Sequence, residues 1–302
     1  MPPLPPLHDS LSGFALPCPR LVSSGGCGTR LPGGIAVPAL RSFEGLRAVV
    51  TGASSGIGEA LALRLAKEGA DVALVARRTA ELDRVARAIR DLGRRALVVP
   101  CDVARRDEVF ASAERILAEF GSVELLVNNA GYGGHRPFLE WDIDDIERIM
   151  QVNYFGAVYW TKALLPKMVE QRRGWIVMMA SVAGKLGVPD ESAYAATKFA
   201  MVGLAEALSY EVEDFGVHVL TVCPGAIDTP FFDEQARRRM PEVAKRMMIE
   251  PARVVEATIR ALRAGKYEVT VPPFIRAGYI VRAVAPGIMR RNIKRVAAPP
   301  LA

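Results

Sequence analysis

Residues 46–59 read Leu-Arg-Ala-Val-Val-Thr-Gly-Ala-Ser-Ser-Gly-Ile-Gly-Glu, and this stretch decides the fold. An apolar run over residues 46–51 leads into a loop with three glycines, and helix-forming residues continue through residues 59–67. A helix that starts directly after such a loop presents free backbone N–H groups and the positive end of its dipole to an anion. The stretch therefore predicts a strand, a phosphate-binding loop and a helix in succession.

Six more apolar runs, rich in β-branched residues, alternate with longer amphipathic segments. They cover residues 72–76, 96–99, 125–128, 175–180, 217–222 and 267–271. Runs that are apolar throughout suit strands of a parallel sheet that helices cover on both faces. We therefore expect an α/β fold, in which one Rossmann-type, doubly wound domain has about seven mostly parallel strands with helices on both faces.

Two helix boundaries can be predicted from individual residues. After Thr79, apolar side chains recur at a spacing of about 3.6 residues and stop at Gly93, which suits a helix C-terminus. Asp142 follows Trp141 and is expected to cap the start of the next long helix.

The net charge of +6 lies mainly at the ends of the chain. Residues 272–302 contain six basic and no acidic residues, whereas residues 43–271 have a net charge of −2. A slightly acidic main domain lacks the basic face that nucleic-acid binding requires, so no nucleic-acid partner is expected. Half of the residues are hydrophobic and 24% are charged, which excludes a fully disordered, collagen-like or coiled-coil chain.

Composition divides the chain into three segments. Residues 1–42 are rich in proline and glycine and are expected to be disordered, with a transit peptide or a misassigned start site as alternatives. Residues 43–271 are expected to form the folded domain, and residues 272–302 a basic, apolar extension. No uncharged apolar run reaches the roughly 18 residues of a membrane span. The four cysteines and three histidines have no ligand spacing, so no metal site is expected.

The glycine loop has the spacing TGxxxGxG, with Gly52, Gly56 and Gly58 at its glycine positions. This spacing resembles that of the short-chain dehydrogenase/reductase family. The resemblance continues with Asp102 after the third strand and with the sequence NNAG at residues 128–131 after the fourth. In the family, the aspartate contacts adenine, and the NNAG element supports the sheet and the cofactor.

Tyr194 and Lys198 lie four residues apart in a predicted long helix, so their side chains share one face. A tyrosine has a pKa near 10 in water, and a neighbouring ammonium is expected to lower this pKa toward the working range. Ser181, 13 residues before Tyr194, and Asn153 complete a set of four residues that resembles the tetrad of the family. The sequence PGAIDT at residues 224–229 resembles the family element that holds the nicotinamide carboxamide.

The resemblance implies an oxidoreductase that transfers hydride between NADP(H) and a carbonyl or secondary alcohol carbon. In reduction, Tyr194 would donate the proton and Ser181 would steady the oxyanion. Lys198 would bind ribose hydroxyls and lower the pKa of the tyrosine, while Asn153 and a water resupply the proton. The cofactor contacts that the resemblance implies are Thr51, Gly52, Ser54, Ser55, Gly56, Ile57, Gly58, Arg77, Asp102, Val103, Asn129, Ala130, Gly131, Tyr194, Lys198, Pro224, Gly225, Ile227 and Thr229.

The end of the second predicted strand favours NADP(H) over NAD(H). Proteins that bind NAD usually place an acid there, whereas an arginine nearby accommodates the 2′-phosphate of NADP. Ala76 occupies the position of the acid and Arg77 follows it. Ser55 stands where many NADP-preferring relatives have a basic residue, so the preference depends mainly on Arg77. Arg78 is interpreted as a solvated charge at a helix start.

Residues 226–249 lie where the family has its variable substrate lid. Aromatic and methionine side chains in this segment favour a lipophilic small-molecule carbonyl or alcohol as substrate. They are Phe231, Phe232, Met240, Met247 and Met248. Tyr132 and His135, just after the NNAG element, either border the pocket or are ordinary loop residues, and the second interpretation is favoured.

Residues 272–302 leave three interpretations open. The segment packs over the substrate opening or a neighbouring subunit, contacts a membrane surface peripherally, or is a frayed terminus. Pro272, Pro273 and Pro286 argue against one continuous helix. The expected location is cytoplasmic, with peripheral membrane contact as the alternative, and relatives imply a homodimer or homotetramer. A non-catalytic cofactor sensor and a reductase of 3-oxoacyl substrates are the alternative functions.

Overall fold

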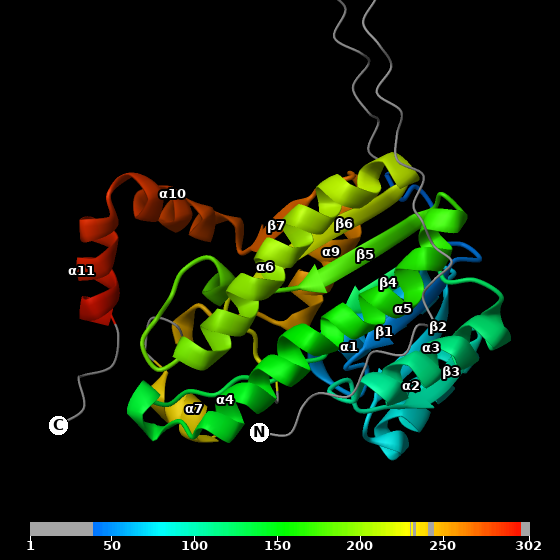
Figure 1. Cartoon of the computed structure of the whole chain (residues 1–302), viewed down its shortest axis with the longest axis horizontal. Coiled ribbons are helices and arrows are strands. Elements are labelled where there is room, and N and C mark those ends of the chain that lie inside the picture. Colours follow the sequence, from blue (N-terminus) through cyan, green and yellow to red (C-terminus); the bar gives the residue numbers. More distant parts are fainter. Residues whose placement is uncertain (1–38, 230, 232–233, 241–244, 297–302) are drawn as a thin grey trace, which may run out of the picture. The chain divides into compact units, whose positions relative to one another are not determined.

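The computed structural model of the chain describes residues 39–229, 231, 234–240 and 245–296. Within these residues lies a parallel sheet of seven strands in the order β3-β2-β1-β4-β5-β6-β7 (Figure 1). The strands are β1 Arg47–Thr51, β2 Asp71–Ala76, β3 Ala96–Pro100, β4 Leu125–Asn128, β5 Gly174–Met179, β6 Val217–Pro224 and β7 Glu268–Val271. Their bounds agree with the predicted strands to within two residues, which confirms the predicted Rossmann-type fold.

Helices cover both faces of the sheet because its strands are apolar on both sides (Figure 1). One face is covered by α1 Gly56–Lys67, α2 Thr79–Asp91 and α9 Pro251–Arg263, and the other by α3 Arg106–Phe120, α5 Gly156–Glu170 and α6 Ser192–Val212. As predicted, α2 ends shortly before Gly93, whose φ of 75° is of the left-handed kind that glycine adopts without strain.

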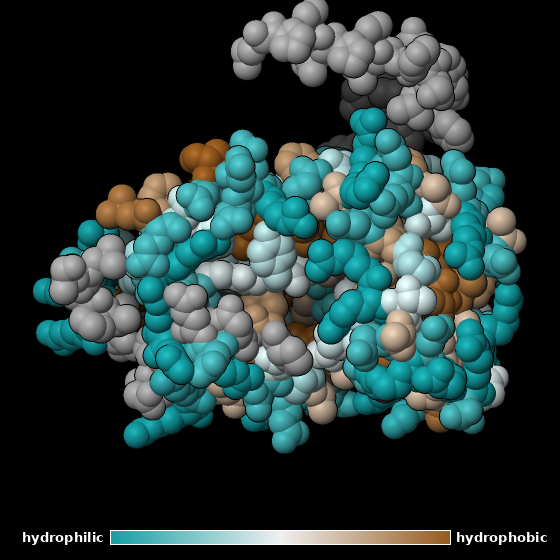
Figure 2. Space-filling model, turned by 90° about the horizontal axis from the view of Figure 1, so that it is seen from below, coloured by the Kyte–Doolittle hydropathy of each residue, from teal (hydrophilic) through white to brown (hydrophobic). Residues whose placement is uncertain are grey.

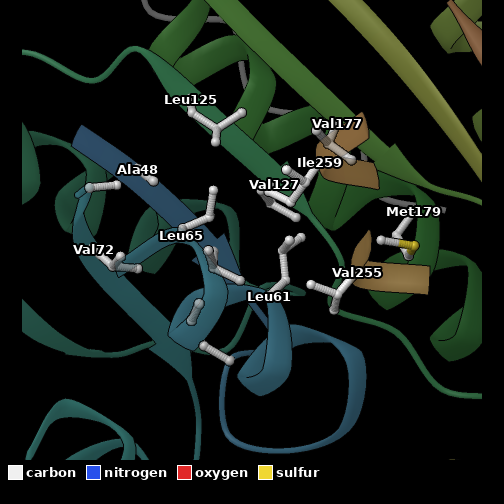
Figure 3. Close-up of a cluster of buried hydrophobic side chains, with 14 of the residues drawn as sticks. Ala48, Leu61, Leu65, Val72, Leu125, Val127, Val177, Met179, Val255 and Ile259 are labelled. Atoms are coloured by element: carbon white, nitrogen blue, oxygen red, sulfur yellow. The ribbon is translucent and has the colours of Figure 1, made fainter. Parts of the chain in front are cut away.

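The core between α1, α9 and the sheet consists of interlocking aliphatic side chains (Figure 3). Leu61 and Leu65 of α1 pack with Val255 and Ile259 of α9 above Val127 of β4, and all five are buried. Full burial of one such side chain stabilises the fold by roughly 1.5–3 kcal/mol. This packing fixes the position of α1, the helix that directly follows the glycine loop.

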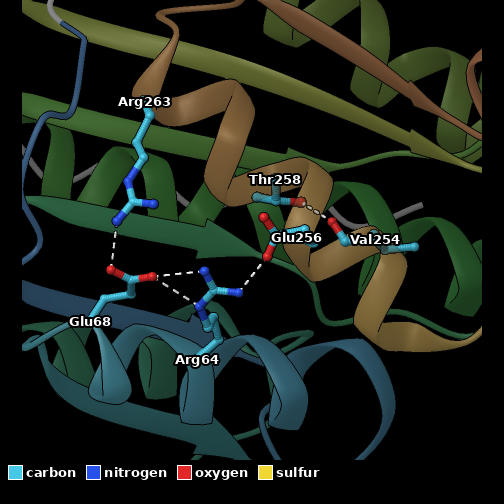
Figure 4. Close-up of polar contacts among 6 residues, drawn as sticks. All are labelled: Arg64, Glu68, Val254, Glu256, Thr258 and Arg263. Atoms are coloured by element: carbon cyan, nitrogen blue, oxygen red, sulfur yellow. Dashed lines mark hydrogen bonds and ion pairs between the residues drawn. The ribbon is translucent and has the colours of Figure 1, made fainter.

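Ion pairs along the outer side of the same two helices hold them together (Figure 4). The guanidinium of Arg64 on α1 lies 2.8 Å from Glu68, the residue that follows this helix, and 2.5 Å from Glu256 on α9. Arg263 of α9 contacts the other oxygen of Glu68 at 2.6 Å. The three contacts join α1 to α9 through one continuous polar network.

The strand order places an opening at the carboxyl ends of the central strands. β1 pairs with β2 on one side and with β4 on the other. The sheet therefore extends from β1 in both directions, through β2 and β3 on one side and through β4 to β7 on the other. At such a switch point, the loops that follow the two strands diverge and leave a crevice. The loops after β1 and β4 are the glycine loop and the NNAG element.

Two predictions about segment ends need correction. Asp142 occupies the N-cap position of α4 Ile143–Met150, but its side chain makes no capping hydrogen bond. Leu40 is 2% exposed and its amide donates to the carbonyl of Leu262 over 3.0 Å, although it falls in the segment predicted to be disordered. Packing against the domain therefore begins before residue 43, and residues 1–38 of that prediction lie outside the described residues.

Two further α-helices follow β7, after a short 3₁₀ turn at Pro273–Ile275. They are α10 Arg276–Val284 and α11 Pro286–Val296, and the chain bends between them at Ala285 (Figure 1). The bend agrees with the predicted interruption at Pro286, because a proline removes a backbone donor and clashes with the preceding turn. In the part of the chain that the structure describes, no helix has the length and apolar character needed to cross a membrane.

Candidate active site

A cleft of about 1140 Å³ opens at the carboxyl ends of β1, β4, β5 and β6. Seen from below the view of Figure 1, the molecule has a hollow that is framed largely by hydrophilic residues (Figure 2). Sites for one small molecule typically enclose roughly 300–1,000 Å³. The cleft is therefore large enough for a dinucleotide and a second ligand.

The glycine loop lines one end of this cleft, and its backbone needs glycine. Gly52 and Gly56 have φ values of 67° and 61°, in the left-handed region. A Cβ on Gly52 would lie 2.8 Å from the side-chain nitrogen of Asn129, and a Cβ on Gly58 would overlap the carbonyl oxygen of Gly52. The loop is thus folded tightly against the NNAG element, with the N-terminus of α1 facing the cleft.

Thr51 joins the ends of β1 and β4. Its hydroxyl accepts hydrogen bonds from the amides of Asn129 and Ala130, over 2.9 and 3.0 Å, and donates to the carbonyl of Val127 over 3.2 Å. Thr51 is buried and does not line the cleft, so it supports the cleft wall from behind.

Two arginines follow β2 at the same end of the cleft. Arg77 and Arg78 both line it, next to Ala76. Arg78 donates from one guanidinium nitrogen to the hydroxyls of Ser54 and Ser55, over 2.9 Å in each case. Arg78 is exposed, in agreement with its interpretation as a solvated charge, but its side chain also reaches back onto the glycine loop, which that interpretation missed.

Tyr194, Lys198 and Ser181 meet at the other end of the cleft. Burial raises the pKa of Tyr194, and a hydrogen bond with Ser181 lowers it only in part. Burial also lowers the pKa of Lys198 to about 8. Its ammonium donates to the carbonyl of Met179 over 2.9 Å and lies 5.6 Å from the centre of the Tyr194 ring.

The prediction that Lys198 lowers the pKa of Tyr194 differs from the structure. The shared helix face does bring the two side chains together, but the phenol is buried, and the desolvation of its charged form outweighs the hydrogen bond that stabilises it. Burial consequently favours the neutral phenol of Tyr194 over its phenolate.

Asn153 is fully buried and does not line the cleft itself, but it holds residues near the cleft in place. Its amide donates to the carbonyl of Tyr132 over 2.8 Å and to the hydroxyl of Thr197 over 3.2 Å, and its oxygen accepts from the amide of Tyr132 over 2.9 Å. It lies in a π-helical turn, Gln151–Phe155, that links α4 to α5. Asn153 therefore fixes the loop after β4 to α6.

The loop after β4 also contacts the start of α6. His135 and Glu191 lie 2.7 Å apart, and the amide of Arg136 donates to the carbonyl of Asp190 over 2.9 Å. Both members of the first pair line the cleft close to Tyr194. Of the two interpretations of His135 and Tyr132, the structure agrees with a place at the border of the pocket and not with the favoured one, since both residues belong to the cleft wall.

A family model for short chain dehydrogenases matches residues 47–239. The chain belongs to the short-chain dehydrogenase family. A relative in this family, dehydrogenase/reductase SDR family protein 7-like of Anopheles gambiae, is 33% identical over 259 residues, which are 82% of this chain and 82% of that protein.

Solved structures of the family share the fold of this short-chain dehydrogenase. The structure of a short-chain dehydrogenase/reductase from Burkholderia phymatum, in complex with NAD, matches with a TM-score of 0.74 and 28% identity, over 86% of this chain and 99% of that chain. A metagenomic short-chain oxidoreductase in complex with NADP matches with a TM-score of 0.66 and 32% identity, over 76% of this chain and 96% of that chain.

Most residues that the sequence singled out in this short-chain dehydrogenase line one cleft. They are Gly52, Ser54, Ser55, Gly56, Ile57, Arg77, Asp102, Val103, Asn129, Ala130, Gly131, Ser181, Tyr194, Lys198, Pro224, Gly225, Ile227 and Thr229. Thr51, Gly58 and Asn153 lie behind its wall instead, where they hold lining residues in place.

In this short-chain dehydrogenase, only some residues of the predicted substrate lid, residues 226–249, line the cleft. Phe231, Met240 and Met247 line it, and the ring of Phe231 meets that of Tyr194 edge-on with centres 5.6 Å apart. Met248 is not among the lining residues, and Phe232 lies outside the described residues. Lining residues from elsewhere were missed, among them Leu186 and Ile293.

Proposed function

We propose that this short-chain dehydrogenase is an NADP(H)-dependent oxidoreductase that interconverts a ketone or aldehyde and an alcohol, with a lipophilic substrate. One observation carries the proposal. A single cleft has an anion-binding loop with two arginines at one end, and Tyr194, Ser181 and Lys198 at the other.

The residues at the loop end fit a dinucleotide. The tight turns at Gly52 and Gly56 leave the N-terminus of α1 open toward the cleft, where its free N–H groups suit a pyrophosphate. Asp102 and Asn129 line the cleft on the adjoining side. When bound, the nicotinamide group supplies or accepts the hydride.

Arg77 and Arg78 support the choice of NADP(H). No carboxylate stands at Ala76 to bind a free ribose 2′-hydroxyl, and two guanidinium groups are available for a 2′-phosphate instead. Arg78 is already oriented by Ser54 and Ser55, so it loses little side-chain entropy on binding a phosphate.

At the other end, Tyr194 holds the proton that a carbonyl oxygen accepts as it becomes an alcohol. Its raised pKa keeps the phenol protonated, and the hydroxyl of Ser181 offers a second hydrogen bond to the same oxygen. Lys198, whose ammonium lies 5.6 Å from the centre of the Tyr194 ring, would bind ribose hydroxyls of the cofactor. Asn153 holds the loop at Tyr132 and also bonds Thr197 of α6, so in this proposal it is a positioning residue.

The wall near Tyr194 supports a lipophilic substrate. Phe231, Met240, Met247, Leu186 and Ile293 supply apolar surface there. Thioether side chains adapt to ligands of irregular shape, and apolar surface favours a large hydrocarbon group next to the reacting carbonyl.

A spectrophotometric screen tests the proposal. The full chain is mixed with NADPH or NADH and a panel of aliphatic, steroid, aromatic and 3-oxoacyl carbonyl compounds, and nicotinamide oxidation is followed. We expect turnover with NADPH that exceeds that with NADH, and the highest kcat/KM for lipophilic ketones or aldehydes. Nucleotide binding without turnover of any compound would instead indicate a cofactor sensor and would contradict the proposal.

A further inference from the structure

The helices α10 and α11 have an exposed apolar side. Ile280 and Val284 lie one turn apart on α10 and are 64% and 77% exposed, and Ile288, beyond the bend at Ala285 on α11, is 49% exposed. We call these three residues the outer strip. In the space-filling view, hydrophobic residues reach the surface at the left end of the molecule, where Figure 1 places α10 and α11 (Figure 2).

The opposite side of the two helices is docked on the domain. The guanidinium of Arg282 donates to the carbonyl of Lys185 over 2.6 Å and lies 5.2 Å from the centre of the Phe199 ring. Ile293 of α11 lines the cleft, as does Ile275 just before α10. The helix pair therefore has a fixed inner side, and the outer strip faces away from these contacts.

Five exposed basic residues, which we call the basic rim, lie on the same two helices as the outer strip. Arg276, Arg290, Arg291, Lys294 and Arg295 are exposed, and no ion pair involves them among the described residues. Residues 272–302 contain no acidic residue that could neutralise them. An apolar strip with a basic rim is complementary to a surface that is apolar beneath and anionic above.

This charge argues against a second copy of the chain as the partner. In a twofold contact the same surface meets itself, so the two basic rims would face each other and repel. The outer strip also lies at a bend between two helices and not in a groove that could receive a peptide. A fluid lipid layer can surround exposed side chains at such a bend, because it needs no preformed binding surface that matches their shape.

We propose that the outer strip and its basic rim bind the protein to an anionic phospholipid surface. The apolar side chains enter the boundary between headgroups and acyl chains, and the five cations attract the headgroups. Asn292 and Ile293 of α11 line the cleft. Membrane binding through the outer strip would therefore bring the edge of the cleft close to the lipid. The proposal does not depend on the proposed enzymatic activity.

Vesicle co-sedimentation of the full chain tests the electrostatic part. One set of vesicles is pure phosphatidylcholine, and the other contains about one third phosphatidylserine. We expect binding to the anionic vesicles only, and weaker binding as salt is added, because salt screens the attraction. Each cation near an anionic membrane contributes on the order of fivefold in affinity, so Arg290→Gln/Arg291→Gln should weaken binding by more than tenfold.

The matched control is Arg87→Gln/Arg115→Gln, which removes the same net charge from exposed positions on α2 and α3. It should bind nearly as well as the unaltered chain. Equal losses in the two double variants would show that only net charge matters, and this would overturn the proposal. So would equal binding to both kinds of vesicle.

A second pair of variants tests the outer strip. Val284→Ser/Ile288→Ser should reduce binding to anionic vesicles, whereas Leu139→Ser/Ile143→Ser, which alters exposed apolar residues near α4, should not. All four positions are exposed, so the fold should persist, and unchanged thermal unfolding would verify this. If Val284→Ser/Ile288→Ser left vesicle binding intact but changed the mass in sedimentation velocity, the strip would be a contact between copies and the proposal would be wrong.

Discussion

Tyr194 and Lys198 sit side by side on one helix, yet burial shifts their pKa values in opposite directions. Because both are removed from water, the charged form of each is disfavoured: the phenol stays protonated, and the pKa of the ammonium falls to about 8. Burial therefore keeps the proton on the phenol at neutral pH, so the group that the proposed carbonyl reduction needs is present in its protonated form.

Tyr194→Phe should reduce kcat by several orders of magnitude while leaving the affinity for NADPH nearly unchanged, because only the transferable proton is removed. Stopped-flow kinetics and a nucleotide titration by fluorescence measure the two quantities. Tyr210→Phe, at an exposed position on the same helix, is the control and should behave like the unaltered enzyme. Substantial turnover in Tyr194→Phe would refute the proposed role.

Arg77→Ala and Arg78→Ala should each weaken NADPH binding on the order of tenfold or more, since each removes a charge-assisted hydrogen bond to phosphate. NADH binding should change much less. Arg87→Ala on α2 supplies a control with the same change in charge. If a titration found equal losses for both nucleotides, the assignment of the arginines to the 2′-phosphate would fail.

At the scale of elements, the contact between α1 and the glycine loop depends on one missing methyl group. Ordinarily, glycine inside a helix is less stable than alanine by about 1 kcal/mol. Gly58 reverses that preference, because a Cβ there would overlap the Gly52 carbonyl oxygen and crowd the side chain of Asn129. The backbone of the loop would have to move away from the helix.

Gly58→Ala should therefore lower the free energy of unfolding by roughly 1–3 kcal/mol and also weaken nucleotide binding. Gly203→Ala is the matched control, because Gly203 lies exposed in α6 with no atom within 4 Å of the added Cβ. It should raise stability by up to about 1 kcal/mol. Urea unfolding followed by circular dichroism measures both, and a stabilised Gly58→Ala would contradict the packing argument.

The elements and the site differ in how far they could be predicted from the sequence. Most strands are apolar on both faces, so a local pattern was enough to find them. Arg78 could not be assigned, because its partners Ser54 and Ser55 lie more than twenty residues away in the chain. The pairing of His135 with Glu191, and the place of Ile293 in the cleft wall, likewise depend on how distant elements pack.

For the molecule as a whole, the buried ammonium of Lys198 makes stability depend on pH. Its pKa of about 8 in the folded protein lies below the ordinary value of 10.5. Between these values the unfolded chain binds the extra proton and the folded chain does not, so the free energy of unfolding rises with pH. Below about pH 8 the buried charge costs about 3 kcal/mol.

Lys198→Met should accordingly be more stable than the unaltered protein at pH 7, and the difference should shrink as the pH rises toward 10. Denaturant unfolding of the two proteins across this range measures it. Subtracting one curve from the other removes the titration that they share. A difference that did not vary with pH would show that Lys198 is solvated in the folded state.

Different stretches of the chain line the two ends of the cleft. Its loop end comes from residues 52–131, whereas the surface around Tyr194 comes largely from residues 179–293. The two halves meet within one cleft but are encoded in separate stretches of the gene. Recombination between relatives at a point after β4 could exchange nucleotide preference independently of substrate preference, and such modular exchange would let one scaffold acquire new combinations of the two.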